Sequence, residues 1–139
     1  RLSVAESCTG GNIAHLITSI SGASDVFEGG AVTYSKELKA SVLGVNPATI
    51  EMHGVVSEAT ALEMVSGAKN RFQTDYAIAV TGVAGPSDDE EGNPAGCVWI
   101  AVAGPDFCEA KKFQFSRNRE RNITMASLSA LNSLHIKLR

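Results

Sequence analysis

Apolar residues along this chain change their spacing several times between the period of a strand and that of a helix. Leu2 and Val4 alternate with polar neighbours, as in a strand, whereas the apolar residues over 13–20 recur every three or four positions, as in a helix. The small residues between these segments include Gly10 and Gly11, whose missing Cβ atoms let the backbone turn tightly. The beginning of the chain therefore predicts a strand-to-helix turn.

The same alternation of periods continues to the end of the chain. The expected strands and helices, in chain order, span residues 2–4, 13–20, 26–34, 35–43, 46–50, 57–72, 76–80, 96–102, 111–115 and 119–138. We therefore predict an α/β fold with three layers (α/β/α), in which helices cover both faces of a central mixed sheet. The length suits a single domain over residues 1–139, and the start at Arg1, directly before a strand, is compatible with a missing N-terminal helix.

Composition narrows the classes of function. Hydrophobic residues make up 44% and charged residues 19% of the chain, and no apolar run approaches the roughly 18 residues of a membrane span. The net charge of −3 and the scattered lysines and arginines disfavour nucleic acid as a partner. The three cysteines fit a reducing compartment, and neither they nor the three histidines have metal-ligand spacing. We expect a cytoplasmic protein with no membrane partner, no nucleic-acid partner, no metal and no cofactor.

The first turn also carries candidate chemistry. Ser7, Cys8 and Thr9 place three candidate nucleophiles or hydrogen-bond donors at the point where the strand ends. N–H groups at the start of a helix, at the positive end of its dipole, favour a phosphate, a carboxylate or a developing oxyanion. The alternative is purely structural: a serine or threonine caps the helix and the glycines make the turn.

A second glycine-containing turn, one lysine and an acidic run extend this candidate site. The apolar strand over 76–80 runs into Thr81–Gly85, a turn that we expect beside the first. Lys39 lies one helical turn beyond the strand over 26–34, although a lone helical lysine is usually solvated. The acidic run Asp88–Glu91 lies between two prolines and predicts a mobile, solvated loop, with a lid or a cation site as alternatives.

Six segments that occur in one order carry a resemblance to a known family. They are Glu6–Gly11, Val32–Ser35 with Lys39, Leu43–Val45, Gly54–Glu58, Thr81–Pro86 and Pro94–Gly96. Together they closely resemble the C-terminal domain of the competence/damage-inducible protein CinA, a family that includes the stand-alone nicotinamide-nucleotide amidohydrolase. The resemblance covers nearly the whole chain.

The resemblance implies hydrolysis of the carboxamide of nicotinamide mononucleotide to nicotinic acid mononucleotide and ammonia, a salvage step that feeds NAD synthesis. In this family the reaction is attributed to a serine–lysine (Ser/Lys) dyad without a metal. By match to the motifs, Ser7 is the nucleophile and Lys39 its general base, which requires a lysine pKa lowered from about 10.4. Cys8 is the alternative nucleophile, because a helix N-terminus lowers the pKa of a thiol.

The remaining site residues follow from the same match. Thr9 or Tyr34 is expected to orient the amide or the lysine. The backbone N–H groups of Cys8, Gly10 and Gly11 are candidates for the oxyanion hole. The opposite wall and the phosphate site comprise Thr81, Gly82, Ala84, Gly85 and Arg119. Of these, the arginine follows the last strand and is assigned to the substrate phosphate, which it can bind through two parallel hydrogen bonds.

Two departures from the family pattern leave other functions open. Ser87–Asp89 stand where the family usually has glycines, and an acidic loop folded towards a phosphate would repel it. Ile123 stands near a position where members often carry an arginine. The alternative is a divergent, catalytically silent member that binds a nucleotide-like ligand. A competence or DNA-damage partner protein is a third hypothesis, which the charge disfavours, and the apolar helices leave a homodimer as an expectation.

Overall fold

A computed structural model describes residues 1–139 of the chain. Its strands are β1 (Leu2–Glu6), β2 (Phe27–Val32), β3 (Tyr76–Gly82), β4 (Cys97–Ala103) and β5 (Cys108–Gln114). Its helices are α1 (Asn12–Thr18), the short 3₁₀ helix η1 (Ala23–Asp25), α2 (Lys36–Leu43), α3 (Pro47–His53), α4 (Glu58–Phe72) and α5 (Arg119–Leu138). None of these helices is long and apolar enough to cross a membrane.

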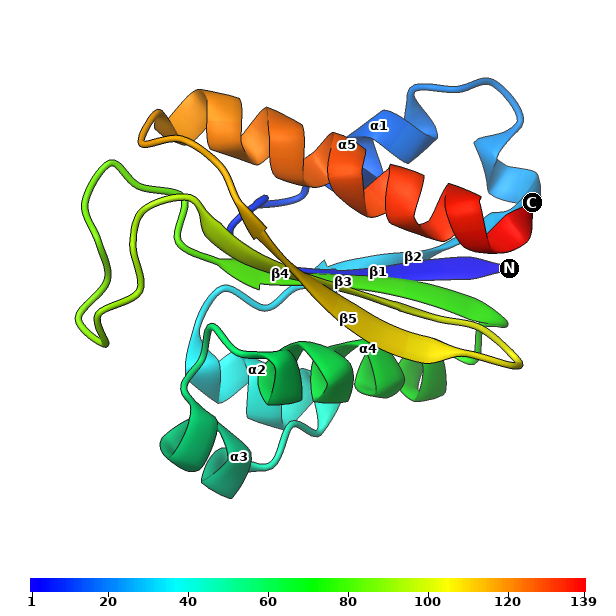
Figure 1. Ribbon diagram of the computed structural model, residues 1–139. Helices are drawn as coiled ribbons and strands as arrows, with labels where there is room; N and C mark the ends of the chain where they lie inside the picture. The colour runs from blue at the N-terminus through cyan, green and yellow to red at the C-terminus, as the bar shows by residue number, and fades with distance from the viewer.

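The five strands form one mixed sheet in the order β2-β1-β3-β4-β5. β1 pairs in parallel with both β2 and β3, whereas β4 pairs antiparallel with β3 and with β5. Helices α1 and α5 cover one face of the sheet, and α2, α3 and α4 lie on the other, as Figure 1 shows. The predicted α/β class and its three layers are therefore confirmed.

Alternation along β3 divides the hydrophobic core between the two faces of the sheet. Ile78 and Val80 pack into the cluster beneath α5, whereas Ala77 and Ala79 pack into the cluster beneath α4. Successive residues of a strand point to opposite faces, and both faces of this central strand are covered, so its sequence is apolar without alternation. The larger side chains thus face one helical layer and the alanines face the other, which leaves little space between α4 and the sheet.

Strand β2 is shorter than predicted and carries a bulge. The sequence predicted a strand over 26–34, but its last two residues leave the sheet and lead into α2. The register with β1 shifts beside Phe27, so that Glu28 has no partner and Gly29 pairs with Ser3. This shift is a bulge directly before Gly29 and Gly30, and glycines inside a strand are typical of such a site. The early exit from the sheet brings α2 to the edge where β1 also ends.

Several other element boundaries differ from the sequence prediction, among them those of β5 and α1. β5 begins at Cys108 rather than at residue 111, because its antiparallel pairing with β4 continues to the pair Ala103 and Cys108. Helix α1 ends at Thr18, although the helical period continues to Ile20, whose side chain is 68% exposed. At β5, pairing with a neighbouring strand rather than local periodicity sets the start of the element.

The parallel pairing of β1 with β3 brings the two glycine-containing turns to one edge of the sheet. Glu6 pairs with Val80, and the N–H of Ser7 donates to the carbonyl oxygen of Val80 at 3.1 Å. Carboxyl ends of parallel strands meet at the same edge, where open α/β sheets commonly bind ligands. The expectation that the second turn stands beside the first is confirmed.

Candidate active site

The two residues predicted as a dyad lie in direct contact. Lys39 Nζ donates a hydrogen bond to Ser7 Oγ at 3.0 Å, although the residues are 32 positions apart. The same Nζ donates to the carbonyl oxygens of Thr33 at 2.7 Å and Tyr34 at 3.2 Å. Lys39 is completely buried, and Ser7 is 6% exposed at the base of a pocket. The amine is thus held on Ser7 by two backbone acceptors.

Local features of α2 direct Lys39 towards Ser7. Ser35 caps the helix, and its Oγ accepts the N–H of Leu38 at 3.2 Å. The helix can therefore begin directly after the chain leaves β2. Side chains of a helix lean towards its N-terminus, which here faces the edge of the sheet that carries Ser7. Gly44, with φ 73°, ends the helix in the left-handed conformation that glycine adopts without strain.

Burial changes the protonation of the lysine. Removal of the amine from water lowers the pKa of Lys39 from 10.5 to about 8, with a smaller opposing effect of Cys8. None of the ion pairs in the structure includes Lys39. A substantial fraction of the amine is therefore neutral slightly above pH 7, and a neutral amine can accept the proton of a serine hydroxyl.

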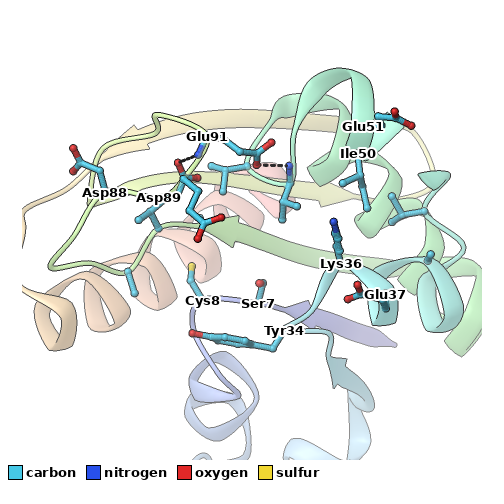
Figure 2. A pocket seen from close by; sticks show the side chains of 18 of the residues that line it. Ser7, Cys8, Tyr34, Lys36, Glu37, Ile50, Glu51, Asp88, Asp89 and Glu91 are labelled. Carbon is cyan, nitrogen blue, oxygen red and sulfur yellow. Dashed lines mark hydrogen bonds between the residues drawn. The ribbon is translucent and has the colours of Figure 1, made fainter. Parts of the chain in front are cut away.

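Cys8 lies beside Ser7 but has the opposite electrostatic setting. Burial raises the pKa of its thiol to about 12, which outweighs the lowering effects of its own backbone hydrogen bond and of Lys39. The thiol is therefore protonated near neutral pH. Its sulfur lines the pocket next to Ser7 (Figure 2). The position fits contact with a ligand better than nucleophilic attack.

The turn after β1 is organised by Glu6, a residue to which the sequence analysis gave no role. Its carboxylate accepts the N–H groups of Gly11, Ile13 and Ala14 at 2.9–3.2 Å and the hydroxyl of Thr9 at 2.6 Å. The start of α1 is therefore closed by a side chain of the protein. The expectation that these helix N–H groups are free for a phosphate or oxyanion is wrong, because Glu6 already occupies them.

A cavity of about 1700 Å³ opens in front of Ser7. Seven of the predicted site residues line it, namely Ser7, Cys8, Tyr34, Gly82, Ala84, Gly85 and Arg119. Lys39 lies behind Ser7. Thr9, Gly10, Gly11 and Thr81 lie near the cavity but do not line it, and the hydroxyl of Thr81 donates to the carbonyl oxygen of Val55 at 3.0 Å. Both turns thus contribute residues to the lining of the cavity.

Tyr34 and Arg119 meet at the mouth of the cavity from elements that are 85 residues apart. The guanidinium of Arg119 donates to the phenol oxygen of Tyr34 at 3.1 Å and to the carbonyl oxygen of Gly85 at 2.6 Å. The phenol does not contact Lys39, so the contact of Tyr34 with the lysine comes from its backbone carbonyl. Arg119 has no carboxylate partner, which leaves its charge available to an anionic ligand.

The acidic run after β3 forms part of the pocket wall. Asp88, Asp89 and Glu91 lie across the cavity from Ser7 (Figure 2). Asp89 accepts the N–H groups of Glu91 and Asn93, and Glu91 accepts the N–H of Val55 at 3.4 Å. The sequence predicted a solvated loop, and the structure adds that hydrogen bonds hold this loop beside the site. No group of three or more His, Cys, Asp or Glu side chains is placed to hold a metal ion.

Two further residues were missed by the sequence analysis. Lys36 lines the cavity one helical turn before Lys39. Asn122 is 1% exposed, and its side chain donates to the carbonyl oxygen of Ala84 and accepts the N–H of Ser116, so it ties α5 to the wall opposite Ser7. A polar residue on the apolar side of the last helix was the available signal for Asn122, because a buried amide needs several partners.

Comparisons with known proteins place these observations among relatives. A family model described as the CinA C-terminal domain matches residues 1–138. A CinA-like protein of Trichormus variabilis is 43% identical over 136 residues, which cover 97% of this chain and 32% of that protein. A CinA-like protein of Desulforapulum autotrophicum is also 43% identical, over 99% of this chain and 33% of its own length. The chain thus spans about a third of these curated relatives.

Solved structures resemble the chain over nearly its whole length. The crystal structure of the competence damage-inducible protein A (ComA) from Klebsiella pneumoniae has a TM-score of 0.96 and 41% identity, and covers 99% of this chain and 86% of that chain. The competence/damage inducible protein CihA from Agrobacterium tumefaciens has a TM-score of 0.95 and 36% identity, with coverage of 99% and 85%.

Proposed function

The chain belongs to the CinA C-terminal domain family, and from this premise we propose that it hydrolyses the carboxamide of nicotinamide mononucleotide to nicotinic acid mononucleotide and ammonia. One observation carries the proposal: a fully buried lysine with a pKa of about 8 donates to the hydroxyl of a pocket-lining serine at 3.0 Å. A neutral amine on a serine hydroxyl is the arrangement needed to activate a weak nucleophile.

The first half of the proposed reaction forms an acyl-enzyme. Neutral Lys39 accepts the proton of Ser7 Oγ while that oxygen attacks the carboxamide carbon, and the carbonyl electron pair moves to the oxygen. The N–H groups of Cys8 and Thr9 donate to no oxygen atom of the protein and can stabilise this oxyanion. The C–N bond then breaks, the lysine ammonium protonates the departing nitrogen, and ammonia leaves.

The second half releases the acid. A water molecule takes the place of ammonia, and neutral Lys39 accepts one of its protons while the water oxygen attacks the ester carbon. The new oxyanion collapses, the bond to Ser7 Oγ breaks, and the lysine returns the proton to the serine. The product is a carboxylate, and the enzyme is restored. Every proton transfer passes through the amine of Lys39, so no second titrating group is required.

The substrate phosphate is assigned to Arg119. This side chain lines the cavity, bonds only to neutral oxygens of Gly85 and Tyr34, and has no carboxylate partner. A phosphate placed there gains charge-assisted hydrogen bonds, and the phenol of Tyr34 lies within reach of the same group. Such a reaction would serve pyridine-nucleotide salvage in the cytoplasm.

A second candidate function is binding of a nucleotide-like ligand without turnover. The observation that favours it is the acidic run Asp88–Glu91 in the pocket wall, because these carboxylates oppose a phosphate-bearing substrate. Under this alternative Ser7 and Lys39 persist as a structural pair. Saturable binding of nicotinamide mononucleotide, with no acid formed at high enzyme concentration, would support it.

The proposal is tested by ammonia and nicotinic acid mononucleotide formed from nicotinamide mononucleotide. Wild type and Cys8→Ala should form both products, whereas Ser7→Ala should lose at least about a thousandfold in rate with its circular dichroism spectrum unchanged. Cys8→Ala is the matched control, since the two residues are adjacent and both line the cavity. No product from wild type, or equal activity of Ser7→Ala and wild type, would overturn the proposal.

A further inference from the structure

We propose that Glu6 is a positioning residue, which holds the turn after Ser7 so that two backbone N–H groups point free towards the oxyanion of the reaction. This inference rests on the proposed amidohydrolase function, and it assigns a role to a carboxylate that does not touch the reacting atoms. Glu6 is 1% exposed and lies immediately before the nucleophile. A charge buried so completely needs several partners.

The carboxylate binds four donors of one short segment. Its Oε1 accepts the hydroxyl of Thr9 at 2.6 Å and the N–H groups of Gly11 at 3.2 Å and Ile13 at 3.0 Å, and its Oε2 accepts the N–H of Ala14 at 2.9 Å. No lysine, arginine or histidine forms an ion pair with Glu6. The donors of the turn and the start of α1 alone balance its charge.

The N–H groups around Ser7 can be accounted for one by one. Gly10 donates to the carbonyl oxygen of Ser7 at 3.0 Å, and the following donors are taken by Glu6 or by the carbonyl oxygen of Thr9. Only the N–H groups of Cys8 and Thr9 donate to no oxygen atom of the protein. Cys8 directly follows the nucleophile, the position that supplies an oxyanion N–H in other serine hydrolases.

Glu6 therefore fixes these two donors from behind. Its bond to the Thr9 hydroxyl holds the side chain of that residue away from the pocket, and its bonds to α1 fix where the turn ends. Thr9 and Gly11 are anchored at the same oxygen, so a shift of the carboxylate would move both ends of the turn. Preorganised donors of this kind act on the transition state more than on bound substrate.

The test is Glu6→Gln, which keeps the shape of the side chain but removes its charge and turns one acceptor into a donor. We expect kcat for nicotinamide mononucleotide to fall about tenfold to a hundredfold, with KM within about twofold. The rise of kcat/KM with pH below about 8 should stay in place, because Lys39 does not contact Glu6. If the fall in kcat of Glu6→Gln is fully explained by the fraction of that variant that is unfolded, the proposal is overturned.

Ser127→Ala is the matched control. Ser127 is fully buried and its Oγ accepts the side-chain N–H of Asn12 at 2.8 Å, so this variant loosens α1 without touching the turn. Its Tm should fall by an amount that corresponds to one lost buried hydrogen bond. Its kcat should stay within about twofold of wild type. If Ser127→Ala and Glu6→Gln lose kcat to the same extent, Glu6 acts through general stability, and the proposal fails.

A probe that needs no turnover separates this inference from the proposed function. Pyridine-3-boronic acid forms a tetrahedral adduct with an activated serine and presents a hydroxyl where the oxyanion would lie. We expect Glu6→Gln to weaken its binding by about tenfold. If wild type deamidates the substrate and Glu6→Gln has the same boronate affinity and the same kcat as wild type, only the role of Glu6 is refuted. Wild type that forms neither product nor adduct refutes both proposals.

Discussion

The two walls of the pocket are built in opposite ways. The wall that carries Ser7 is buried: Lys39 and Glu6 are both almost inaccessible to water, and each is held by several short hydrogen bonds. The wall formed by Asp88–Glu91 is largely exposed, and its hydrogen bonds join neighbouring loop residues and two distant donors, the N–H of Val55 and the guanidinium of Arg117.

This difference separates two tasks. Burial shifts the pKa of Lys39 and so creates chemical reactivity, but burial of an amine costs stability. Exposed carboxylates keep their charge at little cost and act through the field across the cavity, which water and salt weaken. The Ser7 wall should therefore govern the rate of the chemical step, and the acidic wall should govern which ligand enters.

The largest effect is expected when the buried amine of Lys39 is removed from the Ser7 wall. Lys39→Met should abolish turnover, by at least about a thousandfold. It should also raise the free energy of unfolding at pH 7 by about 1–3 kcal/mol, because the folded state no longer buries a protonated amine. Ammonia release and denaturant titration measure the two effects. Lys112→Met, which changes an exposed lysine of β5 outside the cavity, is the control and should change neither quantity strongly. A destabilised Lys39→Met protein would contradict the account.

The pH dependence tests the same wall without a mutation. The pKa of Lys39 is lowered to about 8, so kcat/KM should rise about tenfold per pH unit below pH 8 and level off above it. The stability of wild type relative to Lys39→Met should rise between about pH 8 and 10.5, since the unfolded lysine keeps a proton that the folded one has lost. If kcat/KM stays constant between about pH 6 and about pH 8, Lys39 is excluded as the base.

A change at Arg119 tests the mouth of the pocket, where the two walls meet. Arg119→Gln should raise KM for nicotinamide mononucleotide about tenfold, since a charge-assisted bond to phosphate is lost. The KM of nicotinamide riboside, which lacks the phosphate, should change by less than about twofold. Arg121→Gln, an exposed neighbour outside this cavity, is the control. Equal effects on both substrates would remove the phosphate assignment.

The smallest effect is expected at the acidic wall. The double variant Glu90→Gln with Glu91→Gln should raise kcat/KM for nicotinamide mononucleotide by about twofold to fivefold at low salt, and the gain should disappear at high salt. Steady-state rates over a salt series measure it. Asp106→Asn, in the turn between β4 and β5 at the opposite edge of the sheet, controls for net charge. A gain that persists at high salt would assign the acidic wall a structural role instead.

Much of the architecture follows from short-range patterns in the sequence. Alternation and helical period predicted every strand and helix of the α/β fold apart from the single-turn η1. These features depend on neighbours within a few residues, so one chain contains the necessary signals. Boundaries were less accurate, among them that of β5, where a partner strand sets the start.

The candidate site shows what local patterns leave open. The pairing of Ser7 with Lys39 was expected only from the family resemblance, because no spacing rule joins residues that are 32 positions apart. The contact of the Tyr34 phenol with Arg119 and the place of Asp88–Glu91 in the pocket wall had no local signal. Both depend on contacts between segments that are far apart in the sequence.

The sequence alone determined the order of the elements, the small-residue turn after β1 and the residue types available for chemistry there. The tertiary structure decided what each of these groups does. Burial sets the pKa of Lys39 near 8, and the fold of the turn assigns the helix N–H groups to Glu6 rather than to a ligand. The reason is physical: protonation and hydrogen-bond partners depend on which atoms surround a group in space, and the packing of distant segments supplies those atoms.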